Sequence, residues 1–386
     1  MISIKINSHI EIIELWRGIG YYYNRKVGGR EKRERVGCTM KRIILVSCMA
    51  TFGLCSADTA AHQDSWTWMY QKKFTPQELQ DAAKKHDFMF VKQDLSDFTQ
   101  LMFSWNAFRP TEGHFTFYVQ VRDAKRQTWG SWHKMAEWGA GVQRSFASTA
   151  KDAVKYLHVR LEANPGHEAD AFKIRVHASD SADLSQFRSF AVSLSNFHRF
   201  KESSIDNTLR ALPSTHVANV PKQSQFRVPY ERNDSICSPT SVGMLVGSLT
   251  DQKIDYCKFV RGAFDDGLNV HGSWPFNMAH AFEQCKGHVH FAVGRLHSFA
   301  QLHERLQKGI PVVVSVRGHL YGAPKVYEKG HLLVVIGWDS KRRQVICHDP
   351  AFKSNHKVLK RYTIASFLRA WDRSHRLAYL ADPVRA

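Results

Sequence analysis

The chain has 386 residues, of which 43% are apolar and 12% aromatic. This composition can build a hydrophobic core, excludes a disordered or low-complexity chain, and at this length predicts two or three domains. With a formal net charge of +19 the protein could concentrate at anionic surfaces, although a generally basic surface without a specific partner is the interpretation that we favour. Nucleic acid is not predicted, because the sequence contains no concentrated basic motif outside its first residues and no nucleic-acid-binding signature.

Residues 40–61 have the pattern of a secretory signal peptide. The short basic segment Lys41-Arg42 precedes an apolar run over 43–54, and small residues follow around Ala57. A run of this length is too short to span a bilayer, which requires about 20 apolar residues. The pattern predicts a mature chain without a transmembrane domain that is secreted or periplasmic, as in an exported bacterial protein.

A signal peptide begins at the start of a chain, so the sequence predicts Met40 as the true start. Residues 1–61 are then a leader that is absent from the mature protein. Two alternatives remain open: an uncleaved membrane anchor, and a lipoprotein, because 45–48 (Leu-Val-Ser-Cys) has the chemistry of a lipid-attachment site.

Residues 62–202 have the pattern of a β-rich module. Apolar and polar residues alternate with a period of two over 114–123, 155–163 and 172–176, and turn residues separate these runs. Several short alternating strands predict a β-sandwich-like domain, preceded by a helix over 76–86.

Four tryptophans lie in this module: Trp105, Trp129, Trp132 and Trp138. Exposed rings could stack on sugars and make the module a carbohydrate- or cell-wall-binding domain. Buried rings would be part of the core, which is the interpretation that we favour.

The serine- and proline-containing stretch 203–226 is predicted to link two domains. From residue 227 to 386 the pattern changes to helices alternating with buried strands. We expect helices at 237–245, 296–308 and 363–371, and strands at 311–316, 332–338 and 344–348. The fold class predicted for the whole chain is therefore α+β.

Cys237 is the most specific candidate for chemistry. It opens the string Cys-Ser-Pro-Thr-Ser at 237–241, which has the residues of a helix start before an apolar run. A thiol at a helix N-terminus is exposed to the positive end of the helix dipole, which stabilises the nucleophilic thiolate. Cys257, Cys285 and Cys347 are predicted to be core residues, with a Cys257–Cys285 bridge left open.

A thiolate requires a base and a group that orients the base. His331 begins the buried run 332–338, and Asp349 ends the next predicted strand, so two antiparallel neighbours could bring them together. His271, His319 and His348 are alternatives to His331, which we favour because it lies at the mouth of a buried strand.

These motifs resemble the C39-like peptidase family of papain-like cysteine hydrolases. The resemblance covers roughly 226–385: Val-Pro before the cysteine, Cys-x-Pro-Thr-Ser-x-x-Met, then Gly-His-x-x-Val-x-x-Gly-x-Asp, then Asp-Pro. It implies a papain-like domain with Cys237 as nucleophile, His331 as general base and acid, and Asp349 as the orienting group. No cofactor or metal is implied.

The sequence departs from the family pattern at the oxyanion position. The family places a glutamine about six residues before the cysteine, where this chain has Glu231, and the nearest amide is Asn233. Losing one oxyanion donor typically costs about 10²–10³ in rate. Asn233 is therefore the tentative oxyanion donor.

The predicted function is an exported hydrolase that cleaves a peptide or other amide through an acyl-thioenzyme intermediate, with cell-wall material among the possible substrates. Two alternatives stay open. One is an acyl or peptidyl transferase, and the other is a catalytically weak protein that binds peptide, carbohydrate or cell wall. The oligomeric state is not predicted.

Overall fold

The computed structural model describes residues 65–148, 152–179 and 181–384, and also four short N-terminal strands. These strands form a small antiparallel sheet of their own: β1 (Ser3–Lys5), β2 (Glu11–Ile13), β3 (Tyr22–Val27) and β4 (Arg30–Arg35). The expected signal peptide at 40–61 lies outside the described residues. Among the helices that the structure describes, none has the length and apolarity needed to cross a membrane.

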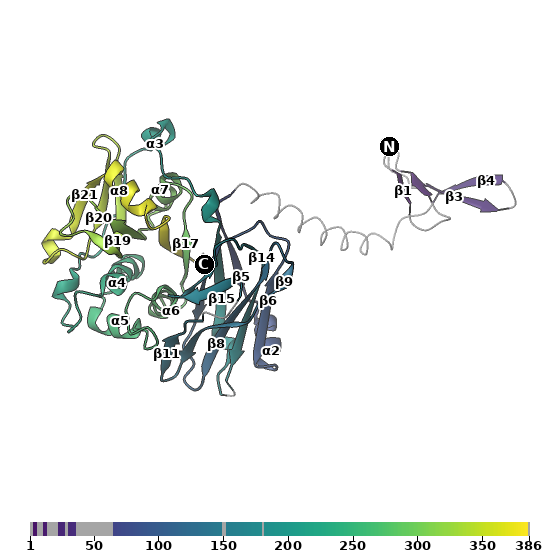
Figure 1. Ribbon diagram of the computed structural model, residues 1–386, viewed down its shortest axis with the longest axis horizontal. Coiled ribbons are helices and arrows are strands. Elements are labelled where there is room, and N and C mark those ends of the chain that lie inside the picture. The colour runs from purple at the N-terminus through teal and green to yellow at the C-terminus, as the bar shows by residue number, and fades with distance from the viewer. Residues whose placement is uncertain are drawn as a thin grey trace. The chain divides into compact units, whose positions relative to one another are not determined.

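The first part of the main body, residues 65–200, consists mainly of two antiparallel sheets (Figure 1). One contains β6 (Asp87–Lys92), β8 (His114–Asp123), β9 (Thr128–Trp129), β10 (His133–Gly139), β11 (Val142–Ser145) and β14 (Ala169–Ala178). The other contains β5 (Thr67–Lys73), β7 (Gln100–Ala107), β12 (Val154–Leu157), β13 (Arg160–Ala163) and β15 (Phe187–Ser195). The predicted early helix is α2 (Pro76–Ala83), which a capping box of Thr75 and Glu78 starts.

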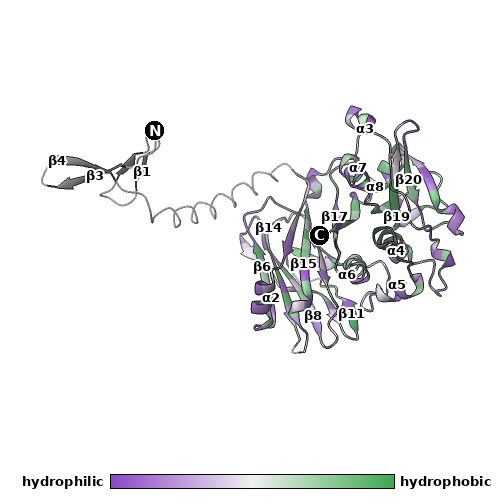
Figure 2. Cartoon of the chain, turned by 180° about the vertical axis from the view of Figure 1, so that it is seen from behind, coloured by the Kyte–Doolittle hydropathy of each residue, from purple (hydrophilic) through white to green (hydrophobic). Residues whose placement is uncertain are grey.

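A shared aromatic core joins these two sheets. Trp105 of β7 stacks on Phe117 of β8 with ring centroids 4.2 Å apart, and Trp138 of β10 contacts Trp105 edge-on. Both tryptophans are fully buried, whereas Trp132 is exposed. The alternation that predicts these strands from sequence is visible as alternating colours along them in Figure 2.

The structure corrects one predicted strand. Residues 155–163, expected to be continuous, form the hairpin of β12 and β13, because His158 and Val159 make a two-residue turn with φ of 47° and 61°. The alternating pattern continues through this turn, and no glycine, proline or asparagine marks it. Sequence periodicity alone therefore does not find it.

The remainder of the chain folds around a third antiparallel sheet, in the order β17-β22-β18-β19-β20-β21 with β16 beside β19. Its strands are β16 (Thr215–His216), β17 (Val289–Arg295), β18 (Val312–Gly318), β19 (Tyr327–Asp339), β20 (Gln344–His348), β21 (Leu359–Thr363) and β22 (Leu377–Pro383). Its helices are α3 (Asn207–Ala211), α4 (Cys237–Thr250), α5 (Tyr256–Gly262), α6 (Trp274–Gln284), α7 (Phe299–Gln307) and α8 (Ile364–Asp372). The whole is a mixed α and β structure in which sheets dominate.

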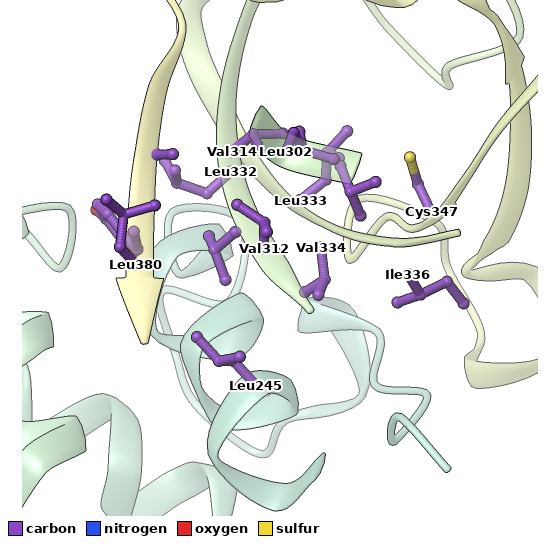
Figure 3. Close-up of a cluster of buried hydrophobic side chains, with 14 of the residues drawn as sticks. Leu245, Leu302, Val312, Val314, Leu332, Leu333, Val334, Ile336, Cys347 and Leu380 are labelled. Carbon is purple, nitrogen blue, oxygen red and sulfur yellow. The ribbon is translucent and has the colours of Figure 1, made fainter. Parts of the chain in front are cut away.

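The core of this half lies between its helices and the third sheet. Figure 3 shows Leu245 of α4 on the side of β19 to which Val334 points, while Cys347 of β20 points away from that helix. The apolar runs that predict β18 and β19 are continuous, because helices cover these strands and both faces are buried. The stretch 203–226, expected to connect two domains, contains α3 and β16.

The two halves belong to one compact unit, residues 61–386. Helix α6 connects them, because Phe276 packs edge-on against Trp105 in the first core while Met278 and Phe282 belong to the second core. Backbone groups of β17, an edge strand of the third sheet, are also bound by side chains of β7. Asn106 exchanges two hydrogen bonds with the backbone of Phe291, at 2.7 and 3.0 Å.

Candidate active site

Cys237 is the first residue of α4, and the helix begins there for local reasons. Thr240 N–H donates to the Ile236 carbonyl at 3.0 Å, which closes the first turn. Pro239 is tolerated in this turn because residues there do not donate an N–H to a carbonyl within the helix. The residue before the helix, Ile236, has no side-chain oxygen to cap it. The first backbone N–H groups of α4 are therefore not used by a side-chain cap, and the half-buried thiol lies beside them.

Two hydroxyls fix α4 against the third sheet. Ser241 Oγ donates to the Leu332 carbonyl at 3.0 Å, and the Ser238 and Tyr379 hydroxyls lie 3.0 Å apart. Leu332 follows His331 on β19, so the bond from Ser241 holds the helix close to the histidine. Ser238 thus has a buried partner of its own.

His331 lies between the thiol and a carboxylate. Its Nε2 is 2.8 Å from Asp349 Oδ1, and the imidazole lies close enough to Cys237 for each of these two groups to shift the pKa of the other. Because Asp349 occupies Nε2, Nδ1 is the ring nitrogen left to exchange a proton with the thiol. The Tyr327 ring stacks on the imidazole at 4.1 Å with an interplanar angle of 17°. The histidine is only 4% exposed, so its orientation is fixed on both sides.

Asp349 is completely buried and accepts four hydrogen bonds. Besides His331, the donors are the hydroxyls of Tyr327 at 2.8 Å and Tyr362 at 2.7 Å, and the backbone N–H of Ala351 at 2.9 Å. A buried carboxylate is costly unless such donors compensate the lost hydration. The four donors keep Asp349 ionised and in one orientation.

The pKa values of the three groups shift in the directions that favour an ion pair. Burial alone would lower the pKa of His331, but the charges of Asp349 and Cys237 outweigh it and raise this pKa to about 9. Burial would likewise raise the pKa of Cys237, yet the charge of His331 and the hydrogen bonds from it and from the Leu332 backbone lower it. The pKa of Asp349 is lowered against its burial, mainly by His331. The arrangement therefore supports a thiolate beside an imidazolium.

The structure places the alternative histidines elsewhere. His348 is buried with Nδ1 against the Pro221 carbonyl at 2.9 Å, and burial lowers its pKa to about 4. His271 lies against the Tyr230 hydroxyl, and burial lowers its pKa to about 4 as well. His319 is exposed. Of the four histidines considered from sequence, the structure brings His331 alone to Cys237 and Asp349.

The other cysteines of the main body are separate thiols. Cys257 and Cys285 do not form the bridge that the sequence left open, since both are free. Cys285 is core, and burial raises its pKa to about 12. Cys347 is also buried, and burial raises its pKa well above the usual value. Within the described residues, no three His, Cys, Asp or Glu side chains cluster closely enough to hold a metal ion.

The segment before α4 is held by an amide that the sequence analysis missed. Glu231 is exposed and Asn233 is half-buried. The Asn233 carbonyl accepts a hydrogen bond from Gln225 Nε2 at 2.9 Å, while Gln225 N–H donates to the Pro350 carbonyl at 3.0 Å. Gln225 is buried, and it ties the strand-end loop at Asp349-Pro350 to the segment that carries Asn233.

Tyr327 and Tyr362 are the other functional residues that sequence reasoning missed. Tyr327 lies four residues before His331, and Tyr362 lies on β21, which pairs with β20. A buried carboxylate at the end of an apolar strand signals that donors must exist, but it does not identify them. Their identity depends on which strands become neighbours.

Comparisons with known proteins agree with the family resemblance. Residues 217–379 match the sequence model described as the Peptidase_C39 like family, which confirms the resemblance for this segment. Among solved structures, the chain is similar to xylellain, a cysteine protease from Xylella fastidiosa, with 10% identity over 49% of this chain and 93% of that chain. The TM-score is 0.29. No curated protein matches the chain in sequence.

Proposed function

We propose that this protein is a cysteine hydrolase with a papain-like catalytic half, which cleaves a peptide or similar amide bond. The observation that carries the proposal is the position of His331, which is 2.8 Å from Asp349 and close enough to Cys237 for the two groups to shift each other's pKa. The pKa directions of all three groups favour a thiolate beside an imidazolium. The match of residues 217–379 to a peptidase-like family supports the same reaction class. The two N-terminal sheets serve in this proposal as a β-sandwich module attached to the catalytic half.

The proposed reaction has two steps. The Cys237 thiolate attacks the carbonyl carbon of the amide, and the His331 imidazolium gives its proton to the leaving amine as the C–N bond breaks. Water then attacks the thioester, and neutral His331 takes a proton from that water as the carbon–sulfur bond breaks. Asp349 accepts from Nε2 throughout, so that Nδ1 stays directed at the sulfur and the imidazolium is stabilised.

The oxyanion that forms in each step needs donors beside Cys237. We assign this role to the uncapped backbone N–H groups at the start of α4, with the Asn233 side chain as a second donor. Gln225 is the positioning residue for Asn233, since it binds the Asn233 carbonyl. Replacing Asn233 with alanine should lower kcat by about 10²–10³ if its amide contacts the oxyanion. An unchanged kcat would leave the helix N–H groups as the donors.

We further propose that the enzyme is exported, with substrates outside the cytoplasm. The support is the basic, apolar and small-residue pattern at 40–61. Mass spectrometry of the protein isolated from culture medium or periplasm tests this. A mature N-terminus shortly after residue 57 is the expected result, and a protein found only in the cytoplasm with residues 1–61 intact would contradict it.

Alkylation tests the activated nucleophile before any substrate is known. At a pH of about 6 an ordinary thiol, whose pKa is about 8.5, is almost entirely protonated, whereas a thiolate paired with imidazolium is not. Iodoacetamide should therefore label Cys237 faster than Cys257, a half-buried thiol that serves as the internal control. The difference should disappear in the His331→Ala variant. Equal rates at both cysteines in the wild-type protein would refute the proposed nucleophile.

A further inference from the structure

A cavity of about 630 Å³ lies next to the proposed catalytic histidine and is built by both halves. Gly330, the residue immediately before His331, lines it, as does Trp274 at the start of α6. The opposite wall comes from the N-terminal sheets, through the turn at His158 and Val159 and through Arg160. The N-terminal module therefore contributes directly to the space beside the proposed active site.

The turn between β12 and β13 is held in an unfavourable conformation at this wall. Val159 has φ of 61°, which a β-branched residue rarely adopts, and His158 before it has φ of 47°. Such residues persist where surrounding contacts fix them, and they are frequent at ligand sites. Val159 is only 3% exposed, and the Arg160 guanidinium lies over the Trp274 ring at 5.6 Å. The hairpin is thus a fixed wall of the cavity.

The loop on the α6 side is fixed to the N-terminal module as well. Asp265 is completely buried and accepts from the Ser145 backbone N–H at 2.9 Å, from the Ser145 hydroxyl at 2.5 Å, and from the Ser273 hydroxyl. It also accepts from the backbone N–H of Gly267 at 3.0 Å. Ser145 belongs to β11, whereas Ser273 lines the cavity, so this carboxylate ties the Ser273 wall of the cavity to the N-terminal module.

The cavity carries an excess of positive charge. Arg317, Lys329 and Arg373 line it, are exposed, and form no ion pair with any carboxylate of the described residues. The sole acidic side chain in its lining is Glu162, which is already paired with Arg160. A cavity lined by one sign of charge concentrates ligands of the opposite sign.

We infer that this cavity is a specificity site for an acidic residue of the peptide substrate, close to the bond that is cleaved. The inference rests on the proposed function, because the cavity can select a substrate residue only if His331, the neighbour of the lining residue Gly330, belongs to an active site. A substrate carboxylate in this cavity could form charge-assisted hydrogen bonds with Arg317, Lys329 and Arg373, and its negative charge would offset their positive charge. The substrate class is therefore an acidic peptide, and the N-terminal module participates in selecting it.

Binding to an inactive variant tests this inference separately from catalysis. The Cys237→Ala protein is titrated into two fluorescein-labelled peptides of equal length, one of alternating alanine and glutamate and one of alternating alanine and glutamine, with fluorescence anisotropy as the readout. The glutamate peptide should bind more tightly, and its advantage should shrink as salt rises, since salt screens exposed charges. Equal affinities for the two peptides at low salt would overturn the inference.

Matched variants localise the effect to the cavity and not to the basic surface in general. The triple variant Arg317→Gln, Lys329→Gln and Arg373→Gln should reduce the preference for glutamate roughly tenfold, as expected for three exposed charge contacts. The control triple Arg210→Gln, Lys253→Gln and Arg369→Gln removes the same net charge at exposed residues outside the cavity, and should keep the preference. Equal losses in both triples would overturn the cavity assignment.

The glutamate and glutamine peptides also distinguish a failure of this inference from a failure of the proposed function. If the wild-type protein cleaves the glutamine peptide as fast as the glutamate peptide, the hydrolase proposal stands and the acidic specificity fails. The opposite outcome has three parts: the Cys237→Ala protein prefers the glutamate peptide, the wild-type protein cleaves neither peptide, and Cys237 is alkylated no faster than Cys257. In that case the acidic site stands and the hydrolase proposal fails.

Discussion

At the scale of single residues, Asp349 determines the chemistry of the site. It is buried, it accepts from four donors, and it lies 2.8 Å from the histidine that lowers the pKa of Cys237. Its negative charge outweighs the burial of His331, which would otherwise leave the imidazole neutral near pH 7. The carboxylate therefore sets both the orientation and the protonation state of the base.

Replacing Asp349 with asparagine should move the alkaline limb of the pH–rate profile. In the wild-type protein kcat/KM should rise as Cys237 ionises and fall as His331 loses its proton at a pH of about 9. Asparagine keeps the shape but removes the charge that raises the histidine pKa, so the alkaline limb should shift to lower pH and the maximum should fall. Kinetics across the pH range measure this, and an unmoved alkaline limb would show that Asp349 does not control His331.

His331 and Asp349 also contribute to the free energy of unfolding, and their contributions change with pH in opposite directions. His331 has a raised pKa, so its stabilising contribution should be full below about pH 6.5, its unfolded value, and should be lost as pH rises through about 9. Asp349 has a lowered pKa, so its contribution should be lost as pH falls below about 4. Urea titrations of the wild-type and Asp349→Asn proteins should therefore differ most near neutral pH. A constant difference at all pH values would contradict this.

Tyr327 has two roles that substitutions can separate. Tyr327→Phe removes the hydroxyl that donates to Asp349 but keeps the ring on His331, and should cost about 1.5–3 kcal/mol, the range for hydrogen bonds to charged groups. Tyr362→Phe removes the other hydroxyl and should cost a similar amount. Tyr327→Leu also removes the stacked ring, so kcat should fall further than in Tyr327→Phe. Urea denaturation and steady-state kinetics measure the two effects, and equal kcat in both Tyr327 variants would assign no role to the ring.

At the scale of elements, the position of α4 against β19 brings the nucleophile to the base. The two elements share an apolar contact around Leu245 and Val334, and one buried hydrogen bond from Ser241 to the Leu332 carbonyl. The apolar contact is tolerant of small shifts, whereas the hydrogen bond is directional. Ser241 therefore fixes where the helix start lies relative to His331.

Ser241→Ala should destabilise the protein and lower the rate at which Cys237 is alkylated. The variant leaves the buried Leu332 carbonyl without this donor, which should cost about 1–3 kcal/mol. Ser235→Ala, at an exposed residue before the helix whose hydroxyl contacts its neighbour Asp234, is the control and should change little. Urea denaturation measures the cost, and alkylation of Cys237 reports the helix position. A Ser241→Ala protein as stable and as reactive as the control would assign the positioning to apolar packing alone.

At the scale of the whole molecule, the two halves depend on each other for buried contacts. Asn106 of β7 satisfies the backbone N–H and carbonyl of Phe291 on β17, and Phe276 of α6 completes the core between the N-terminal sheets. Asp265 adds a third connection through Ser145. Separating the halves would expose apolar surface and leave several backbone groups without partners.

We therefore expect the main body to unfold in one cooperative transition. Differential scanning calorimetry of the mature protein should show a single peak, and Asn106→Ala should lower its temperature, since two buried groups lose their partner at a cost of about 1–3 kcal/mol each. Lys125→Ala, at an exposed turn residue of the N-terminal module, serves as the control. Two separate peaks, with Asn106→Ala affecting only one of them, would show that the halves are independent domains.

Much of the fold could be predicted because its signals are local. Period-two alternation located β8, and β14 extends the predicted run by a few residues at each end. Continuous apolar runs located β18 and β19, since covered strands are buried on both faces. Helix ends were less well placed, as α4 continues to Thr250, because capping and packing decide where a helix stops.

The sequence by itself determined which residues could form the proposed site. A cysteine at a helix start, a histidine opening a buried strand and an acid at the end of the next strand are local patterns, because dipole, periodicity and turn chemistry act over neighbouring residues. The order of these motifs also carried the family resemblance, which the match over 217–379 confirms.

Only the tertiary structure decided what surrounds those residues. Tyr327 and Tyr362 reach Asp349, Gln225 holds Asn233, and the β12–β13 hairpin closes a cavity beside His331, although these segments are far apart in sequence. Burial, which shifts the pKa values and makes each hydrogen bond necessary, is a property of the assembled core. It arises when distant segments exclude water together, and no local pattern encodes it.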